Sequence, residues 1–307
     1  MANISIPTLS LQSLTSPDHR ARSVQTIGHA LERSGFFIVT DHGISPGQIA
    51  ECYRAAEAFF RLPEEIKLAC HRPESNSQRG FTKFGREHAK DNTQPDLKEF
   101  YQIGREDSNI LPPNVWPKEP VEFREMIGGL YHQIENIGLA LLGACSEYLE
   151  LEADHLPRLA GGGDSILRVI HYPPIDGDAG LATRSAAHQD INFITLLIQA
   201  TEGGLELQTP DGEWVAIEAE SNQLIVDSCD MMANLTNGQF RSTMHRVVNP
   251  PDLAKRRLSM PFFMHPTKDT DLTPLPPCIE RTSGQADYPN WTAGDFLTKR
   301  LKEIGLA

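Results

Sequence analysis

The sequence has few basic residues for its length and lacks paired cysteines. Lysine and arginine number 28 against 41 aspartates and glutamates, so the formal net charge of the 307-residue chain is −13. Nucleic acid is therefore not an expected partner, because neutralising its phosphates requires a basic surface. The five cysteines are scattered, with neither a C-x-x-C pair nor a zinc-finger spacing. This pattern predicts reduced, buried thiols in a cytoplasmic protein.

Long apolar runs are also missing. The longest, around IGLALLGAC, is far too short to span a bilayer, and the N-terminal MANISIPTLSLQSL lacks the basic and apolar regions of a signal peptide. The composition, 39% hydrophobic and 22% charged, is that of a soluble globular protein. We therefore expect a cytoplasmic protein that does not bind membranes, with a monomer favoured.

Helical spacing of apolar residues dominates the first 160 residues. It predicts amphipathic helices over 20–35, over 45–60 and, longest of all, over 120–151. Residues 71–116 are polar and turn-prone, and we interpret them as a long excursion of the kind that forms lids or binding loops.

The period of the apolar pattern changes to two from Ser165 onward. Short β-rich runs follow one another between Gly, Pro, Asn and Asp, which predicts an antiparallel sandwich or barrel. The runs are SILRVIHY, INFITLLIQ, GLELQT, EWVAIE, NQLIVDS, HRVVNP and RLSMPFFM. We expect one domain over 1–307, with a helix-rich part (1–160), a β-core (161–275) and a C-terminal segment (276–307).

The stretch AAHQDINFITLL places two side chains that can bind a metal at the start of an apolar run. On a strand, residues i and i+2 share a face, so His188 and Asp190 can bind one ion while Gln189 points away. Alone, this pair is also compatible with an ordinary hydrogen-bonded histidine. His245 begins another β-run and can supply a third ligand. Two histidines and one carboxylate leave open positions on the metal, as in non-haem Fe(II) oxygenases, whereas a structural zinc site has four protein ligands.

Arg257 and Ser259 repeat the i, i+2 geometry on a later run. Arginine binds a carboxylate through two parallel hydrogen bonds, and a serine hydroxyl adds a donor to the same oxygens. The two side chains can therefore form a carboxylate site, although an ordinary salt bridge would also account for Arg257. Arg256 is expected on the opposite face.

The whole chain resembles a known family, the Fe(II)/2-oxoglutarate-dependent dioxygenases of the isopenicillin N synthase-like type. The resemblance runs nearly from end to end and rests on ordered matches. They are GFFIVTDHGI, FFRLPEEIK, RGF, DLKEFYQIG, LRVIHYPP, HQDINFITLL, GGLELQTPDGEWVAI, MANLTNGQFRSTMHRVV, RLSMPFF and YPNWTAGDFLTKRL.

The resemblance implies a mainly β fold with flanking helices. Its core would be a distorted double-stranded β-helix, also called a jelly-roll or cupin-like core, covered by N-terminal helices and a long central helix. By this pattern His188, Asp190 and His245 bind Fe(II), and Arg257 and Ser259 bind the distal carboxylate of 2-oxoglutarate.

Further positions of the family pattern lie near the implied site. Tyr172 stands at the family's tyrosine before proline, which contacts the cosubstrate in some members and is equally well explained as a core aromatic. Two departures are evident: Ile170 replaces a frequent asparagine, and Asp227 and Cys229 stand where Asn and Gly are common.

The implied activity is that of an oxidoreductase in secondary metabolism. It would hydroxylate, desaturate or cyclise a small-molecule metabolite with O₂ while 2-oxoglutarate is decarboxylated to succinate and CO₂. We expect the substrate to contact Arg79, Phe81, Phe193 and Phe263. Two alternatives remain open, an iron oxidase of the same family that does not use 2-oxoglutarate and a non-catalytic cupin-like binding protein.

Overall fold

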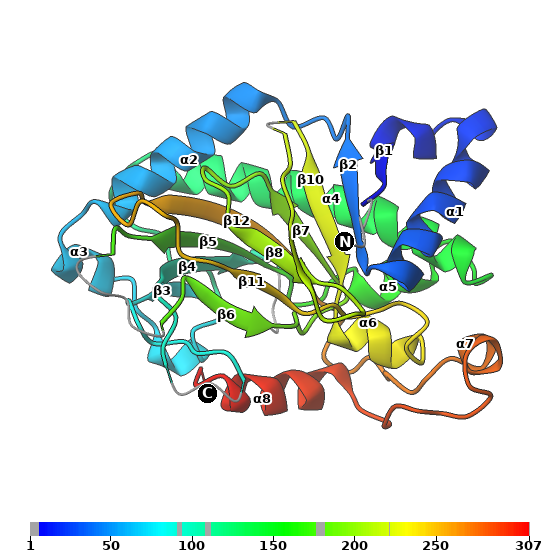
Figure 1. Cartoon of the computed structure of the whole chain (residues 1–307). Coiled ribbons are helices and arrows are strands. Elements are labelled where there is room, and N and C mark those ends of the chain that lie inside the picture. The colour runs from blue at the N-terminus through cyan, green and yellow to red at the C-terminus, as the bar shows by residue number, and fades with distance from the viewer. Residues whose placement is uncertain (1–5, 91–93, 108–111, 176–181, 221, 307) are drawn as a thin grey trace.

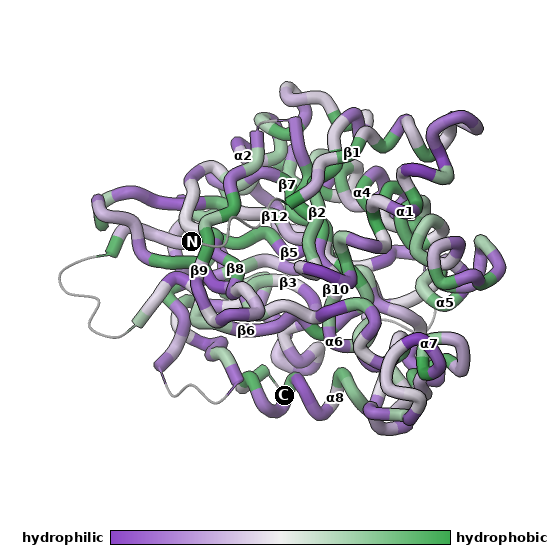
Figure 2. The backbone as a smooth tube through the Cα atoms, turned by 45° about the vertical axis from the view of Figure 1, so that its right-hand side comes forward, coloured by the Kyte–Doolittle hydropathy of each residue, from purple (hydrophilic) through white to green (hydrophobic). Residues whose placement is uncertain are grey.

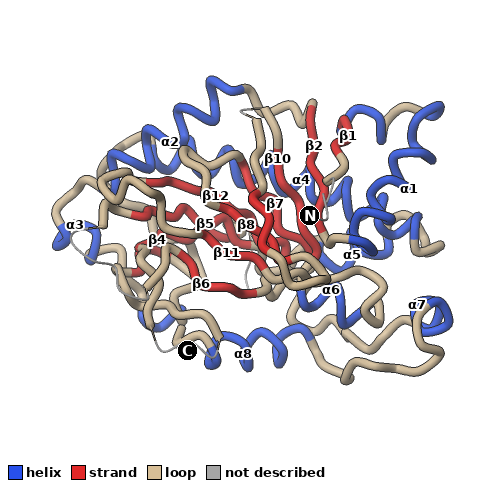
Figure 3. The backbone as a smooth tube through the Cα atoms, in the orientation of Figure 1, coloured by secondary structure: helices blue, strands red, loops and turns tan. Residues whose placement is uncertain are grey.

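The computed structural model describes residues 6–90, 94–107, 112–175, 182–220 and 222–306. Strands form the centre of the molecule and helices lie around them (Figures 1 and 3). The strands are β1 (Thr8–Ser10), β2 (Phe36–Thr40), β3 (Gly80–Thr82), β4 (Glu99–Gly104), β5 (Ile166–Tyr172), β6 (Ser185–His188), β7 (Ile194–Ile198), β8 (Leu205–Gln208), β9 (Trp214–Ala216), β10 (Leu224–Ser228), β11 (His245–Val247) and β12 (Arg257–Met264). The α-helices are α1 (Pro17–Arg33), α2 (Pro46–Phe60), α3 (Glu64–Leu68), α4 (Phe123–Tyr148), α5 (His155–Ala160), α6 (Asp230–Leu235), α7 (Pro276–Arg281) and α8 (Ala293–Glu303).

The strands form two sheets. The larger has eight strands in the order β1-β2-β10-β7-β12-β5-β4-β3, and the smaller has four in the order β6-β11-β8-β9. Strands β1 and β2 are parallel, whereas the other pairs within these sheets are antiparallel. Most strands therefore bond to neighbours that are distant in sequence, as in a double-stranded β-helix. Each run that was predicted from its two-residue period after Ser165 contains a strand.

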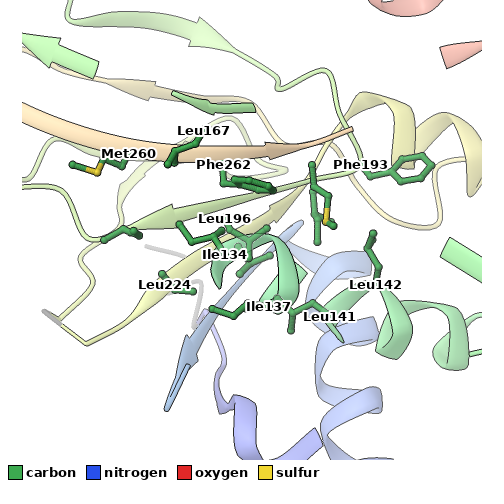
Figure 4. Close-up of a cluster of buried hydrophobic side chains, with 14 of the residues drawn as sticks. Ile134, Ile137, Leu141, Leu142, Leu167, Phe193, Leu196, Leu224, Met260 and Phe262 are labelled. Carbon is green, nitrogen blue, oxygen red and sulfur yellow. The ribbon is translucent and has the colours of Figure 1, made fainter. Parts of the chain in front are cut away.

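Helix α4 covers one face of the larger sheet. Its apolar stripe, which includes Ile134 and Leu141, packs against side chains of the strands such as Leu196 and Phe262 (Figure 4). Gly138 lies in this contact, because a Cβ placed there would be only 2.6 Å from Sδ of Met264. The long amphipathic helix that the sequence predicts therefore closes the main core.

Residues 71–116 do not form a simple excursion. Strands β3 and β4 lie within this range and extend the larger sheet through pairing of β4 with β5. All six residues of β4 are buried, including Glu99 and Gln102, whose polarity hid the strand in the sequence. The cost of burying the charge of Glu99 is offset by its ion pair with Lys67, and the buried amide of Gln102 accepts a hydrogen bond from Arg168.

Hydropathy follows the layers of the molecule. Apolar stretches gather along the central strands, and hydrophilic ones run along the outer loops (Figure 2). Among the described residues, no helix combines the length and apolar character that crossing a membrane requires.

Candidate active site

Three potential metal ligands meet where the smaller sheet borders the core. His188 ends β6, and His245 begins β11 and is its partner in the sheet register. Asp190 lies just beyond β6, with Oδ1 at 3.6 Å from Nε2 of His188 and 3.8 Å from Nε2 of His245. One ligand atom from each of the three residues lies within 4.8 Å of the others. Bonds of about 2.1 Å let one ion bind atoms up to about 4.2 Å apart, so both measured distances suit a single ion.

Hydrogen bonds orient all three side chains. Nδ1 of His188 donates to the carbonyl of Ala186 at 2.7 Å, and Nδ1 of His245 donates to the carbonyl of Thr243 at 3.2 Å. Nε2 of each ring is thereby left as the metal-binding atom. Thr195 donates to Oδ2 of Asp190 at 2.6 Å, which leaves Oδ1 for the ion.

Electrostatics favour a neutral histidine beside an ionised carboxylate. Burial and the neighbouring His188 lower the pKa of His245 to about 4. Burial alone would raise the pKa of Asp190, but His245, His188 and the hydrogen bond from Thr195 outweigh it and lower that pKa. These are the protonation states that metal binding requires.

The prediction that His188 and Asp190 share one strand at the start of the apolar run is wrong in its detail. Strand β6 ends at His188 and β7 begins at Ile194, so Asp190 belongs to the connection between the two sheets. The apolar run fills the core from the larger sheet, while the histidine belongs to the smaller one.

Asp227 and Cys229 lie close to one of these ligands, Asp190. Each offers an atom within 4.8 Å of Asp190, and both are buried. Burial and the charge of Asp190 raise the pKa of Asp227 well above its usual value. This shift favours the protonated, neutral form of Asp227 beside the carboxylate of Asp190.

Arg257 and Ser259 lie in a cavity that also contains the histidines and the aspartate. Nε of Arg257 donates to the carbonyls of Glu202 and Gly203, at 3.0 and 3.2 Å. Its Nη1 is buried and has no hydrogen-bond partner within the described chain. A buried cationic donor without a partner is costly, so this atom suits a carboxylate ligand. Tyr172 is the register partner of Arg257, whose guanidinium lies 5.2 Å from the centre of the tyrosine ring.

A second arginine stands near the same ring. Arg184 is buried, and its guanidinium lies 5.9 Å from the ring centre of Tyr172. Its Nη2 donates to the carbonyl of Lys255. Burial and the charge of Arg257 lower the pKa of Arg184.

The cavity measures about 330 Å³, and Phe263 lines it as expected. The other three expected substrate contacts do not line it. Phe81 and Phe193 are core side chains, and Phe193 is visible among the buried apolar residues of Figure 4. Arg79 is buried in an ion pair with Asp164. Aromatic side chains near a site motif fill the hydrophobic core more often than they line a binding cavity, and Phe81 and Phe193 do so here.

The structure adds cavity residues that sequence reasoning missed. They are Glu87, Asp96, Lys98, Gln102, Arg168 and, from α8, Leu297, Arg300 and Leu301. One signal was available for Arg168, because Tyr172, Ile170 and Arg168 alternate along β5 and must share a face. The loop and α8 residues carry no such signal.

Known proteins share the sequence and the fold. Residues 6–119 match the family described as non-haem dioxygenase in morphine synthesis N-terminal, and residues 163–266 match the 2OG-Fe(II) oxygenase superfamily. A 2-oxoglutarate-Fe(II) type oxidoreductase of Emericella nidulans is 31% identical over 300 residues, covering 92% of this chain and 85% of that protein. The chain belongs to the Fe(II)/2-oxoglutarate-dependent dioxygenases of the isopenicillin N synthase-like type.

Solved structures of related proteins confirm the jelly-roll core. A 2OG-Fe(II) oxygenase family protein from Caulobacter crescentus has a TM-score of 0.86 and 37% identity, covering 97% of this chain and 99% of that one. A full-length Neurospora crassa protein in complex with alpha-KG and thymine has a TM-score of 0.86 and 28% identity, covering 97% and 96%. This dioxygenase is thus an oxidoreductase that uses Fe(II), 2-oxoglutarate and O₂.

Proposed function

We propose that His188, Asp190 and His245 hold the Fe(II) and that Arg257 and Ser259 bind the distal carboxylate of 2-oxoglutarate. The proposal rests on one observation: the three ligands and the unpartnered Nη1 of Arg257 belong to the same cavity. Two histidines and a carboxylate suit Fe(II) and leave positions for other ligands. Tyr172, packed beneath Arg257, would fix the guanidinium.

Bound Fe(II) and 2-oxoglutarate supply the oxidising chemistry, since decarboxylation to succinate and CO₂ activates O₂ against a C–H bond. The chain contributes position and exclusion of water. Apolar side chains of the cavity wall, including Ile170, Leu197 and Ile225, limit access of water to the cosubstrate end. The product would be a hydroxylated, desaturated or cyclised small molecule.

We also propose that residues 1–307 work as one domain, composed of parts 1–160, 161–275 and 276–307. The larger hydrophobic cluster, which has members in all three parts from Leu9 to Ala293, supports this. We further propose a monomer that acts in the cytoplasm, supported by five free, buried cysteines. A role in secondary metabolism is proposed because the cavity has the size of a small-molecule site.

The test compares two adjacent arginines. Arg257 is buried at the cavity, whereas Arg256 is partly exposed and pairs with Glu57. Without oxygen, the protein given Fe(II) and 2-oxoglutarate should develop the visible metal-to-ligand charge-transfer band. Arg257→Ala should weaken 2-oxoglutarate binding by about 10-fold or more, the effect of losing a charged hydrogen-bonded pair, and Arg256→Ala should not.

If the iron-loaded protein showed neither the charge-transfer band nor formation of succinate from 2-oxoglutarate, Arg257 and Ser259 would not be the 2-oxoglutarate-binding residues. Turnover without 2-oxoglutarate would instead support an oxidase of the same family, and iron binding without any turnover a non-catalytic protein.

A further inference from the structure

Four charged side chains form a buried network in the cavity wall. Nζ of Lys98 lies 2.6 Å from Glu87 and 2.8 Å from Asp96, and Nη1 of Arg168 lies 3.0 Å from Glu87. All four side chains are at most 11% exposed. With two acids and two bases, the network carries no net charge when all four are ionised.

Glu87 and Lys98 are both held in their ionised forms near neutral pH. Burial alone would raise the pKa of Glu87, but the charges of Arg168 and Lys98 outweigh it and lower the pKa to about 2. Burial would likewise lower the pKa of Lys98, yet Asp96 and Glu87 raise it. Arg300, a cavity cation on α8, also has carboxylate neighbours, at 3.2 Å in Asp230 and 3.3 Å in Glu303.

Arg168 is held in one orientation and keeps one nitrogen free. Its Nε donates to Gln102 at 2.8 Å, and its Nη1 donates to both oxygens of Glu87. The guanidinium also lies over two rings, at 4.2 Å from the centre of Phe100 and 5.1 Å from that of Phe263. Nη2 makes no hydrogen bond to the described residues and is not among their fully buried unpaired atoms. Because Arg168 lines the cavity, these N–H groups can donate to a bound molecule.

Phe263 presents an apolar surface next to this donor. It lines the cavity and is only partly buried, whereas Phe100, the other ring near the guanidinium, is buried and does not line it. A flat group that accepts a hydrogen bond from Nη2 can therefore lie against Phe263, and aromatic side chains favour such stacking.

Charge decides which acceptor fits. A carboxylate would add a negative charge to a network in which Glu87 already compensates Arg168, in a site where unpaired charge is costly. A carbonyl oxygen accepts the same hydrogen bond without that cost.

We propose that the substrate of this dioxygenase carries a neutral carbonyl group conjugated to a flat ring, with the oxygen bound by Nη2 of Arg168 and the ring against Phe263. This assignment rests on the proposed function of the cavity. Arg168 and Phe263 then determine specificity, and Glu87 sets the preference for a neutral group.

The experiment uses benzamide and benzoate, which share a ring and differ in charge, together with cyclohexanecarboxamide, which lacks the flat ring. Dissociation constants are measured on the whole chain loaded with Fe(II) and 2-oxoglutarate without oxygen, from the perturbation of the charge-transfer band. The melting temperature provides a second readout that does not depend on turnover.

The wild-type protein should bind benzamide at least about 10-fold more tightly than benzoate, whose buried charge would lack a compensating partner. It should also bind benzamide more tightly than cyclohexanecarboxamide, which cannot stack on Phe263. Arg168→Lys keeps the charge but loses the planar fork, and should weaken benzamide binding by about 10-fold. Glu87→Gln removes the compensating charge and should shift the preference toward benzoate.

Arg124 is the matched control, because it also lies over a ring, that of Trp116, and pairs with Glu106, but is 65% exposed. Arg124→Lys should bind all three compounds as the wild type does.

Tighter binding of benzoate than of benzamide by the wild-type protein would overturn the inference, as would failure of both to bind while the band is intact. Unchanged selectivity in Glu87→Gln would overturn it even if Arg168→Lys failed to fold. Absence of the charge-transfer band from the wild-type protein would contradict the proposed function instead. Failure of the proposed function can therefore be distinguished from failure of this inference.

Discussion

At the scale of single residues, ligand binding and stability depend on which side chains of the candidate site are charged and which are protonated. Two features reach beyond the iron ligands. One is Arg184, the second arginine near the ring of Tyr172, which raises the positive potential where the distal carboxylate of 2-oxoglutarate is proposed to bind. The other is His265, a buried cavity residue whose Nδ1 has no partner in the described chain.

Arg184 should strengthen 2-oxoglutarate binding through its charge. Arg184→Met removes the charge and should raise the dissociation constant of 2-oxoglutarate by roughly fivefold, or about 1 kcal/mol for a partly screened cation. Arg184→Lys keeps the charge but changes the hydrogen bond to the carbonyl of Lys255. Titration of the charge-transfer band separates the two effects, because equal weakening in both variants would assign Arg184 a structural role instead.

His265 should make the iron-free protein less stable in mild acid. Burial lowers its pKa to about 4, whereas an unfolded histidine takes up a proton below about pH 6.5. Between these values the unfolded state binds more protons, so stability falls as the pH drops through this window. The contribution at pH 5 is about 2 kcal/mol relative to pH 7.

His265→Gln cannot titrate and should lose less stability than the wild type between pH 7 and pH 5. Urea unfolding at both pH values provides the measurement. An equal loss in both proteins would show that His265 does not control this dependence.

At the scale of elements, helix α4 packs one of its faces closely against the larger sheet. Gly129 and Gly138 belong to the same helix but meet different surroundings. A Cβ at Gly129 would have nothing within 4 Å, whereas one at Gly138 would press on Sδ of Met264. Glycine at position 138 therefore lets the helix approach the sheet.

The two glycines should respond oppositely to alanine. Gly129→Ala should stabilise the protein by about 0.5–1 kcal/mol, because alanine loses less conformational freedom in a helix. Gly138→Ala should instead destabilise it, by about 1–3 kcal/mol, because the buried Met264 must move within a packed core. Chemical denaturation of both variants measures the difference, and stabilisation of similar size in both would contradict this packing argument.

The sequence predicted elements well where one face is apolar and poorly where polar groups are buried in pairs. The strands after Ser165 were predicted because they are short β-rich runs between turn residues. Only β8 and β11 among them alternate regularly between buried and partly buried positions, whereas β10 is buried throughout. Strand β4 was missed because Glu99 and Gln102 find partners in Lys67 and Arg168, which lie far away along the chain. The same reason hid the network of Glu87 and its neighbours. His188 and Asp190, in contrast, were predicted as metal ligands from their i, i+2 spacing together with His245 at the start of a later run.

At the scale of the whole molecule, ligand binding should stabilise the fold. A ligand that binds only the folded state at 100 times its dissociation constant adds about 2.7 kcal/mol. For a chain of this size that corresponds to a rise in Tm of roughly 5 °C. We expect such a rise when Fe(II) and 2-oxoglutarate are added without oxygen.

His188→Ala should abolish this rise and reduce turnover by more than about 100-fold, since even the partners of metal ligands cost 10–100-fold when removed. Its circular dichroism should match that of the wild type. His29→Ala, at an exposed position on α1, is the control that should retain the rise. An undiminished rise in His188→Ala would argue against its role as a ligand.

The lining of the cavity comes from different parts of the architecture. The histidines, Arg257 and Ser259 belong to strands of the two sheets, whereas Leu297, Arg300 and Leu301 come from α8, which lies along the edge of the molecule (Figure 1). Evolution can therefore exchange α8, or the loop that carries Glu87, without disturbing the strands that hold the iron ligands. In this arrangement a duplicated gene could acquire a new substrate by changing its periphery, while its oxidative chemistry is inherited intact.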